Sequence, residues 1–186
     1  MLFLIKGFGP LRMEKKLIYF FILFLFILSL SLTIFAKDQK QTNPFKSYIT
    51  NSPLIFSASI GLIFSFTGMV EMNLGQFYFG QIPINYCFGL ISTIFIQSST
   101  FSLALSPVMS VHLGFSSIPL ELIEAIGLGV GFEINSEIKP KIAFTALFQI
   151  NYYLTNNNGI FIQISSISGY MNWGFGIFFN TVGGKK

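Results

Sequence analysis

Apolar and polar residues alternate with a period of two over most of this chain. From Leu54 to Thr67, large apolar residues such as Phe56 and Leu62 fill one set of alternate positions, and mostly small or hydroxyl residues fill the other. Successive side chains of a β-strand point to opposite faces, so the pattern predicts a strand with one apolar face, on which Leu62 would face lipid at mid-span. Strands of soluble sheets usually have about 5–6 residues, whereas a tilted strand that crosses a bilayer needs roughly 9–11.

Turn-forming residues divide the alternating region into eight predicted strands. Their ranges are 53–67, 69–79, 83–97, 101–114, 120–133, 140–153, 160–167 and 170–179. Eight is the smallest regular strand number of a closed transmembrane barrel, and closure pairs the backbone groups that an open edge would leave unpaired in hydrocarbon. We therefore expect an all-β fold, an eight-stranded antiparallel transmembrane β-barrel over residues 53–179.

Four residues fit this register less well. Glu71 and Gln76 fall on opposite faces of the second predicted strand, which weakens that strand. Glu124 would fall on the lipid face if the fifth strand began early. Pro107 lies in the middle of the fourth strand, where the missing N–H argues against a strand or demands a β-bulge.

Residues 1–36 are predicted to be a signal peptide that forms an N-terminal signal helix. Lys15 and Lys16 precede the apolar run 17–35, and the small residue Ala36 follows it, which is the order of a secretory signal. Met13 is a better start than Met1, which would add an extension of twelve residues before the signal. An uncleaved anchor is the alternative reading, because the apolar run is long enough to span a membrane.

Two polar segments flank the predicted barrel. Residues 37–52 contain lysines and a proline, and we expect a periplasmic leader that is poorly ordered until the first strand. Residues 180–186 form a C-terminal tail.

Composition supports a membrane environment and excludes several functions. The 186 residues are 52% hydrophobic and only 10% charged, whereas a soluble domain carries about 25% charged residues. The formal net charge is +4, but no Lys or Arg lies between Ser47 and Ile138, which argues against nucleic-acid binding. Cys87 is the single cysteine, so an intrachain disulfide and a multi-cysteine metal site are excluded.

The last predicted strand carries a short motif. Asn172, Gly174, Ile177 and Phe179 occupy the polar, glycine, hydrophobic and aromatic positions of a pattern that resembles the C-terminal assembly signal of bacterial outer-membrane barrels. In that family the outer-membrane assembly machinery reads this strand. The seven residues that follow Phe179 depart from the family, in which many chains stop at the aromatic residue.

Residues 53–179 resemble the small eight-stranded OmpA/OmpX-like barrels, and the Phe-, Ile- and Asn-rich style is similar to small spirochaete barrels, those of Borrelia in particular. The resemblance implies an integral protein of the bacterial outer membrane. It also implies the lipid bilayer and the barrel assembly machinery as partners, and a host or cell-surface protein as a further one. Members of such families serve as adhesins, structural proteins or narrow channels.

Residues that could carry chemistry are few. Ser110, His112 and Glu133 are predicted to face the lumen, and a serine, the single histidine and an acid from Glu121 or Glu124 could make a hydrolase. The simpler interpretation of His112 is a lumenal side chain bonded to hydroxyls or water. Glycines 127, 129 and 131 lack the lysine and the strand–turn–helix setting of a phosphate site.

We therefore predict no catalytic, cofactor or metal residues. The sequence favours a non-catalytic outer-membrane protein with a structural or adhesin-like surface role. A narrow channel is the alternative, which eight strands disfavour because side chains fill the interior. A lipid-modifying enzyme is a further alternative and rests on His112 alone.

Overall fold

The computed structural model describes residues 43–50, 52–62, 64–97 and 100–181. The predicted signal peptide, residues 37–42 of the predicted leader and the last five residues of the tail lie outside this part of the chain. The barrel lies within the compact unit Phe45–Lys186. No helix among the described residues is long and apolar enough to cross a membrane.

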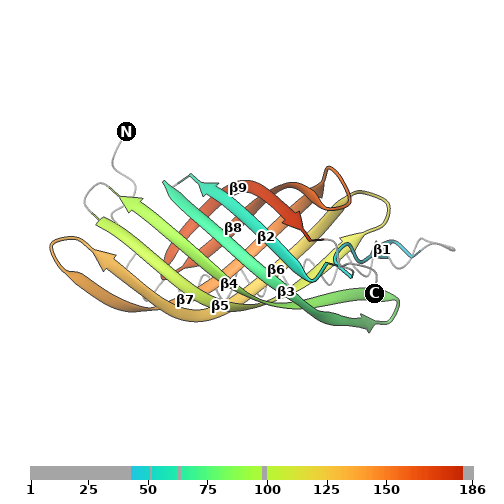
Figure 1. Cartoon of the computed structure of the whole chain (residues 1–186), viewed down its shortest axis with the longest axis horizontal. Helices are drawn as coiled ribbons and strands as arrows, with labels where there is room; N and C mark the ends of the chain where they lie inside the picture. The colour runs from blue at the N-terminus through green and yellow to red at the C-terminus, as the bar shows by residue number, and fades with distance from the viewer. Residues whose placement is uncertain (1–42, 51, 63, 98–99, 182–186) are drawn as a thin grey trace, which may run out of the picture. The chain divides into compact units, whose positions relative to one another are not determined.

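Eight long antiparallel strands form a closed ring, as the sequence predicts (Figure 1). Each strand pairs with its neighbours in sequence, β2 pairs with β9, and β5 pairs with β6 within the ring. A ninth, two-residue strand, β1, is added to β5. The bounds are β1 Phe45–Lys46, β2 Leu54–Gly61, β3 Ser65–Phe79, β4 Ile82–Gln97, β5 Thr100–Phe115, β6 Leu120–Ile134, β7 Ile138–Tyr153, β8 Asn158–Ile167 and β9 Tyr170–Asn180.

Alternate residues of each strand face the lumen, and they fill it. Small and polar side chains bond to one another in the interior: Thr67 bonds to its ladder partner Thr93 at 3.0 Å, and Thr145 of β7 donates to Ser106 of β5 at 2.8 Å. A buried apolar cluster occupies the half of the lumen away from the start of β2 and the end of β9: Met69, Ile91, Phe95, Ala104, Val108, Ala125, Ala143, Leu147 and Ile167. The outward positions of the same strands are mostly exposed large apolar residues, as a lipid-facing wall requires.

The first predicted strand, 53–67, is wrong beyond Gly61. Gly61 pairs with Ser65, so the chain reverses direction between these two residues, and Phe64 in this turn has a φ of 26°. Leu62 therefore lies in this turn at the barrel rim and not at mid-span. A turn of three residues leaves the period-two pattern in phase, because Ser59 and its partner Thr67 both face the lumen.

A β-bulge explains the irregular pattern of β3. The register with β4 shifts between Asn73, which pairs with Cys87, and Gly75, which pairs with Tyr86. The extra residue moves Gln76 to the lumenal side, where it pairs with the buried Asn85, so Glu71 and Gln76 share one face. The opposite-face assignment of these two residues is corrected by this bulge.

Pro107 causes no bulge and does not end its strand. It pairs with Leu90 of β4 in unbroken register, whereas the ladder between β5 and β6 omits Ser106 and Pro107. The backbones of β5 and β6 come very close at this point. A Cβ atom on Gly129 would lie 2.0 Å from the carbonyl oxygen of Leu105, so glycine is required there.

The end of the leader is ordered, contrary to expectation. Phe45 and Lys46 pair with Phe115 and Gly114, and Ile49 is completely buried. The aromatic ring of Tyr48 stacks on that of Tyr153 with 4.1 Å between the centroids. Residues 45–50, called the cap below, thus close the end of the barrel at which β2 begins and β9 ends.

Candidate functional site

Four buried residues form a charged and polar cluster in the lumen beneath the cap. Glu71 comes from β3, Ser110 and His112 from β5, and Glu121 from β6; we call them the acid–histidine cluster. Each is at most 2% exposed. Burial of several ionisable side chains in one place is costly unless they satisfy one another, so the cluster marks a specific arrangement.

Glycine in β4 makes this arrangement possible. Glu71 and His112 lie on strands that do not pair, because β4 runs between them. Glu71 pairs with Gly89 of β4, and a Cβ atom on Gly89 would lie 2.9 Å from the Cγ atom of Glu71. The missing side chain lets Glu71 pass over β4 and reach β5.

His112 lies between two carboxylates. Its Nε2 is 3.4 Å from Glu71 Oε1, and its Nδ1 is 3.4 Å from Glu121 Oε1. The contact with Glu71 also has the geometry of a hydrogen bond, whereas the contact with Glu121 is within ion-pair distance but lacks that geometry. The Ser110 hydroxyl donates a short hydrogen bond to Glu71 Oε1.

Neutral side chains form hydrogen bonds with the other carboxylate oxygen of Glu121. Its Oε2 accepts hydrogen bonds from the Tyr153 hydroxyl at 2.9 Å and from Asn151 Nδ2 at 3.0 Å. Gln149 donates in turn to Asn151, and Asn180 donates to the Tyr153 oxygen. The network therefore runs from β3 through β5, β6 and β7 to the end of β9.

The cluster brings a serine, a histidine and an acid together in the order of a hydrolase triad. Ser110 Oγ is 3.4 Å from His112 Nε2, and Glu121 is at the opposite ring nitrogen. Two features oppose catalysis: the Ser110 hydroxyl donates to Glu71, and the three side chains are sealed from solvent. Among the described residues, no group of three or more His, Cys, Asp or Glu is arranged to hold a metal ion.

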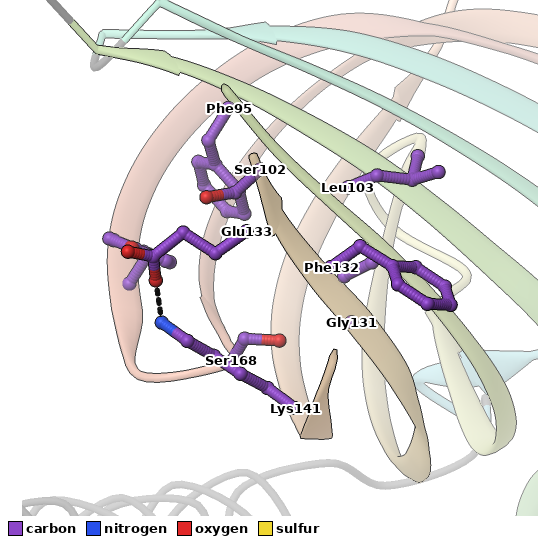
Figure 2. A pocket seen from close by; sticks show the side chains of 10 residues that line it. Phe95, Ser102, Leu103, Gly131, Phe132, Glu133, Lys141 and Ser168 are labelled. Atoms are coloured by element: carbon purple, nitrogen blue, oxygen red, sulfur yellow. Dashed lines mark hydrogen bonds and ion pairs between the residues drawn. The ribbon is translucent and has the colours of Figure 1, made fainter. Parts of the chain in front are cut away.

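Glu133, the third lumenal candidate, lies at the opposite end of the barrel and does not join the cluster. Its carboxylate forms an ion pair with Lys141 of β7 beside a small pocket (Figure 2). The cavity of about 10 Å³ is close to the least volume that one water molecule needs. Lys141 also lies 5.9 Å from the ring centroid of Tyr170.

Glu124, the other acid considered for the triad, faces away from the lumen. It pairs with Val111 and Phe148, and its sequence neighbours Ile123 and Ala125 are the residues that point inward. Within the described strands it is the one charged residue on the outward face. Its Oε1 atom has no hydrogen-bond partner in the described part of the chain.

The four residues of the predicted assembly signal lie along β9. Asn172 is buried in the lumen, and Gly174 pairs with Gly61 and Gln163. Ile177 and Phe179 face outward, 49% and 50% exposed, opposite Ala58 and Phe56 of β2. The motif thus lies on the strand that closes the ring.

Sequence reasoning missed Glu71 as a member of the site. The β-bulge at 73–75 makes the face of Glu71 ambiguous in the sequence. The one local signal is Gly89, which lies directly opposite on β4 and leaves room for a large side chain to cross that strand. Tyr153 and Asn151 lie on the lumenal face of β7, and their bonds to Glu121 depend on the pairing of β6 with β7.

Comparisons with known proteins give distant structural likenesses. No protein-family model and no curated protein matches the chain. The N-terminal β-barrel domain of Pseudomonas aeruginosa OprF shares 16% identity at a TM-score of 0.48, over 69% of this chain and 95% of that one. The outer-membrane enzyme PagL shares 11% identity at a TM-score of 0.42, over 68% of this chain and 97% of that one. A de novo designed transmembrane β-barrel shares 16% identity at a TM-score of 0.36, over 77% of this chain and 100% of that one. Likeness at this level carries no argument about function.

Proposed function

We propose that this chain is an integral protein of the bacterial outer membrane with a non-catalytic role, structural or in surface interaction, and a lumen closed to solutes. The barrel supplies the first support. The ring closes through β2 and β9, so it has no open edge along its length, and its outward wall is apolar. The β9 motif supplies the second, because it resembles the strand that the outer-membrane assembly machinery reads.

The observation that carries the closed lumen is the acid–histidine cluster beneath the cap. Glu71, His112 and Glu121 connect β3, β5 and β6 across the interior, each at most 1% exposed. The cap then fills the mouth on the same side. A solute would have to break this network and displace the cap, so the geometry disfavours the narrow channel.

Planar-bilayer recordings of the refolded protein test this proposal. We expect no unitary conductance steps from heat-modifiable, folded protein, while a porin reconstituted under the same conditions conducts. Reproducible steps that disappear when the sample is boiled before reconstitution would overturn the closed lumen and establish the channel.

A surface-interaction role must operate through a small exposed area. At the end of the barrel opposite the cap, consecutive strands are separated by only two or three residues: β2 from β3, β4 from β5, β6 from β7 and β8 from β9. Connections of two or three residues present little binding surface, so a host or cell-surface partner would contact these turns alone. A pull-down with the detergent-solubilised barrel tests this role, and a barrel that retains no surface protein supports the structural alternative.

A hydrolase is the second candidate, favoured by the order Ser110, His112, Glu121. A fluorophosphonate probe labels an activated serine, so the probe should leave the folded wild-type protein unlabelled if the role is non-catalytic. Labelling that is lost in Ser110→Ala and retained in Ser106→Ala, another buried lumenal serine of β5, would favour the enzyme.

A further inference from the structure

The cap is attached to the barrel by a small set of contacts at the lumen mouth. Asn85 Nδ2 donates to Ser47 Oγ at 2.6 Å, and Asn73 Nδ2 donates to the carbonyl oxygen of Ile49 at 2.7 Å. The Tyr48 hydroxyl contacts the carbonyl oxygens of Phe115 and Ile118 at 2.9 and 3.0 Å. Ile49 fills an apolar hole beside Ile55 and Cys87.

These contacts are few compared with those that hold the ring. β1 contributes two residue pairs with β5, whereas β4 and β5 form a continuous ladder from Asn85–His112 to Gln97–Thr100. Local segments that pair through short ladders open at lower free energy than the elements they cover. The cap can therefore leave the mouth while the barrel stays folded.

We propose that residues 45–50 are a detachable cap over the acid–histidine cluster, which opens independently of the barrel and exposes the cluster to the aqueous phase at the end of the barrel where β2 begins. In the closed state the cap seals the mouth. In the open state Glu71, His112 and Glu121 lose the cover that keeps them from water. The proposal concerns the mouth of the lumen and does not depend on whether the barrel conducts.

Cys87 is a native reporter of this opening. It lies directly beneath Ile49, is completely buried, and pairs across the ladder with Ser110 of the cluster. It is also the one cysteine of the chain, so thiol labelling reads a single position. Any reagent that reaches Cys87 from the mouth must first pass the cap.

The experiment measures the rate at which a water-soluble maleimide labels Cys87 in the refolded full-length barrel. In the wild type we expect slow labelling, far below that of a free thiol. Ile49→Ala removes the side chain that fills the hole, and we expect labelling to rise by about thirtyfold or more. Tyr48→Phe keeps the aromatic stack but loses the hydroxyl contacts, and we expect a rise of about two- to tenfold.

Ile167→Ala is the matched control. Ile167 is as buried as Ile49 but belongs to the apolar cluster away from the cap, so its truncation destabilises the barrel and leaves the mouth intact. We expect Cys87 labelling in Ile167→Ala to stay close to the wild-type rate. Heat-modifiability on a gel confirms that each variant is folded.

Three results would contradict the proposal of a detachable cap. Wild-type Cys87 that labels as fast as a free thiol would mean that the mouth is open. Unchanged labelling in folded Ile49→Ala would mean that the segment does not control access. Equal acceleration in Ile49→Ala and Ile167→Ala would mean that labelling follows unfolding of the whole barrel.

Discussion

His112 Nε2 lies 3.4 Å from Glu71 Oε1, although the two residues belong to strands that β4 separates. The contact depends on the absence of a side chain at Gly89, which Glu71 passes on its way to β5. A single glycine on the intervening strand therefore determines whether the acid–histidine cluster can form.

Gly89→Ala should destabilise the barrel by about 1–3 kcal/mol, because the new methyl group lies where Glu71 and the backbone of β3 already are. Gly68→Ala is the matched control, since nothing lies within 4 Å of a Cβ atom at that strand position. Urea unfolding in lipid vesicles measures both variants. Equal effects of the two substitutions would show that Glu71 does not cross β4 at this point.

His112→Leu should lower the free energy of unfolding by about 3–5 kcal/mol, because it leaves two buried carboxylates facing an apolar side chain. Adding Glu71→Gln to this variant should recover part of the loss by removing one of the charges. The same urea titration reads both effects. A single substitution without cost would contradict the ion-pair arrangement around His112.

Glu124→Leu should stabilise the barrel in a bilayer, because a charged group on the lipid-facing wall is unfavourable and Glu124 Oε1 has no partner among the described residues. Glu137→Leu serves as the control, since Glu137 lies in the connection between β6 and β7 and is exposed to water. A loss of stability in Glu124→Leu would indicate that this carboxylate binds a partner in the membrane.

Leu90→Arg should cost about 2–4 kcal/mol in bilayer stability, because Leu90 faces outward in the middle of β4. Leu62→Arg should cost about 0–1 kcal/mol, since Leu62 lies at the rim in the turn between β2 and β3. Reversible folding into vesicles compares the two. If Leu62→Arg were as costly as Leu90→Arg, the chain would not turn at residues 62–64.

The strand pattern was predictable because the lumen and lipid select opposite residue types at alternate positions. The first turn was not, because residues 62–64 are apolar and their odd number keeps Ser59 and Thr67 on the same face. The bulge at 73–75 was hidden for a related reason: one extra residue reverses the pattern without any change in composition. The local sequence shows which face of a strand a side chain occupies, but it does not show which residue of a neighbouring strand lies beside it.

The cap and the cluster depended on contacts that no local pattern contains. Residues 45–50 read as a polar leader, and only the hole beside Cys87 explains the buried Ile49. Ser110 and His112 could be placed in the lumen from alternation alone. Their contacts with Glu71 and Glu121 required the order of the four neighbouring strands β3 to β6 and the missing side chain at Gly89.

Closure of the ring by β2 and β9 is tested most directly by a disulfide across that seam. Ala58 and Ile177 are opposite each other on the outward face, so cysteines there, in a Cys87→Ser background, lie at cross-strand distance. We predict an intrachain disulfide in folded, heat-modifiable monomer from outer-membrane fractions. The offset pair of Ala58→Cys with Phe179→Cys should form little, because Phe179 is paired with Phe56. No intrachain disulfide at Ala58–Ile177, or disulfides only between separate chains, would contradict the closed barrel.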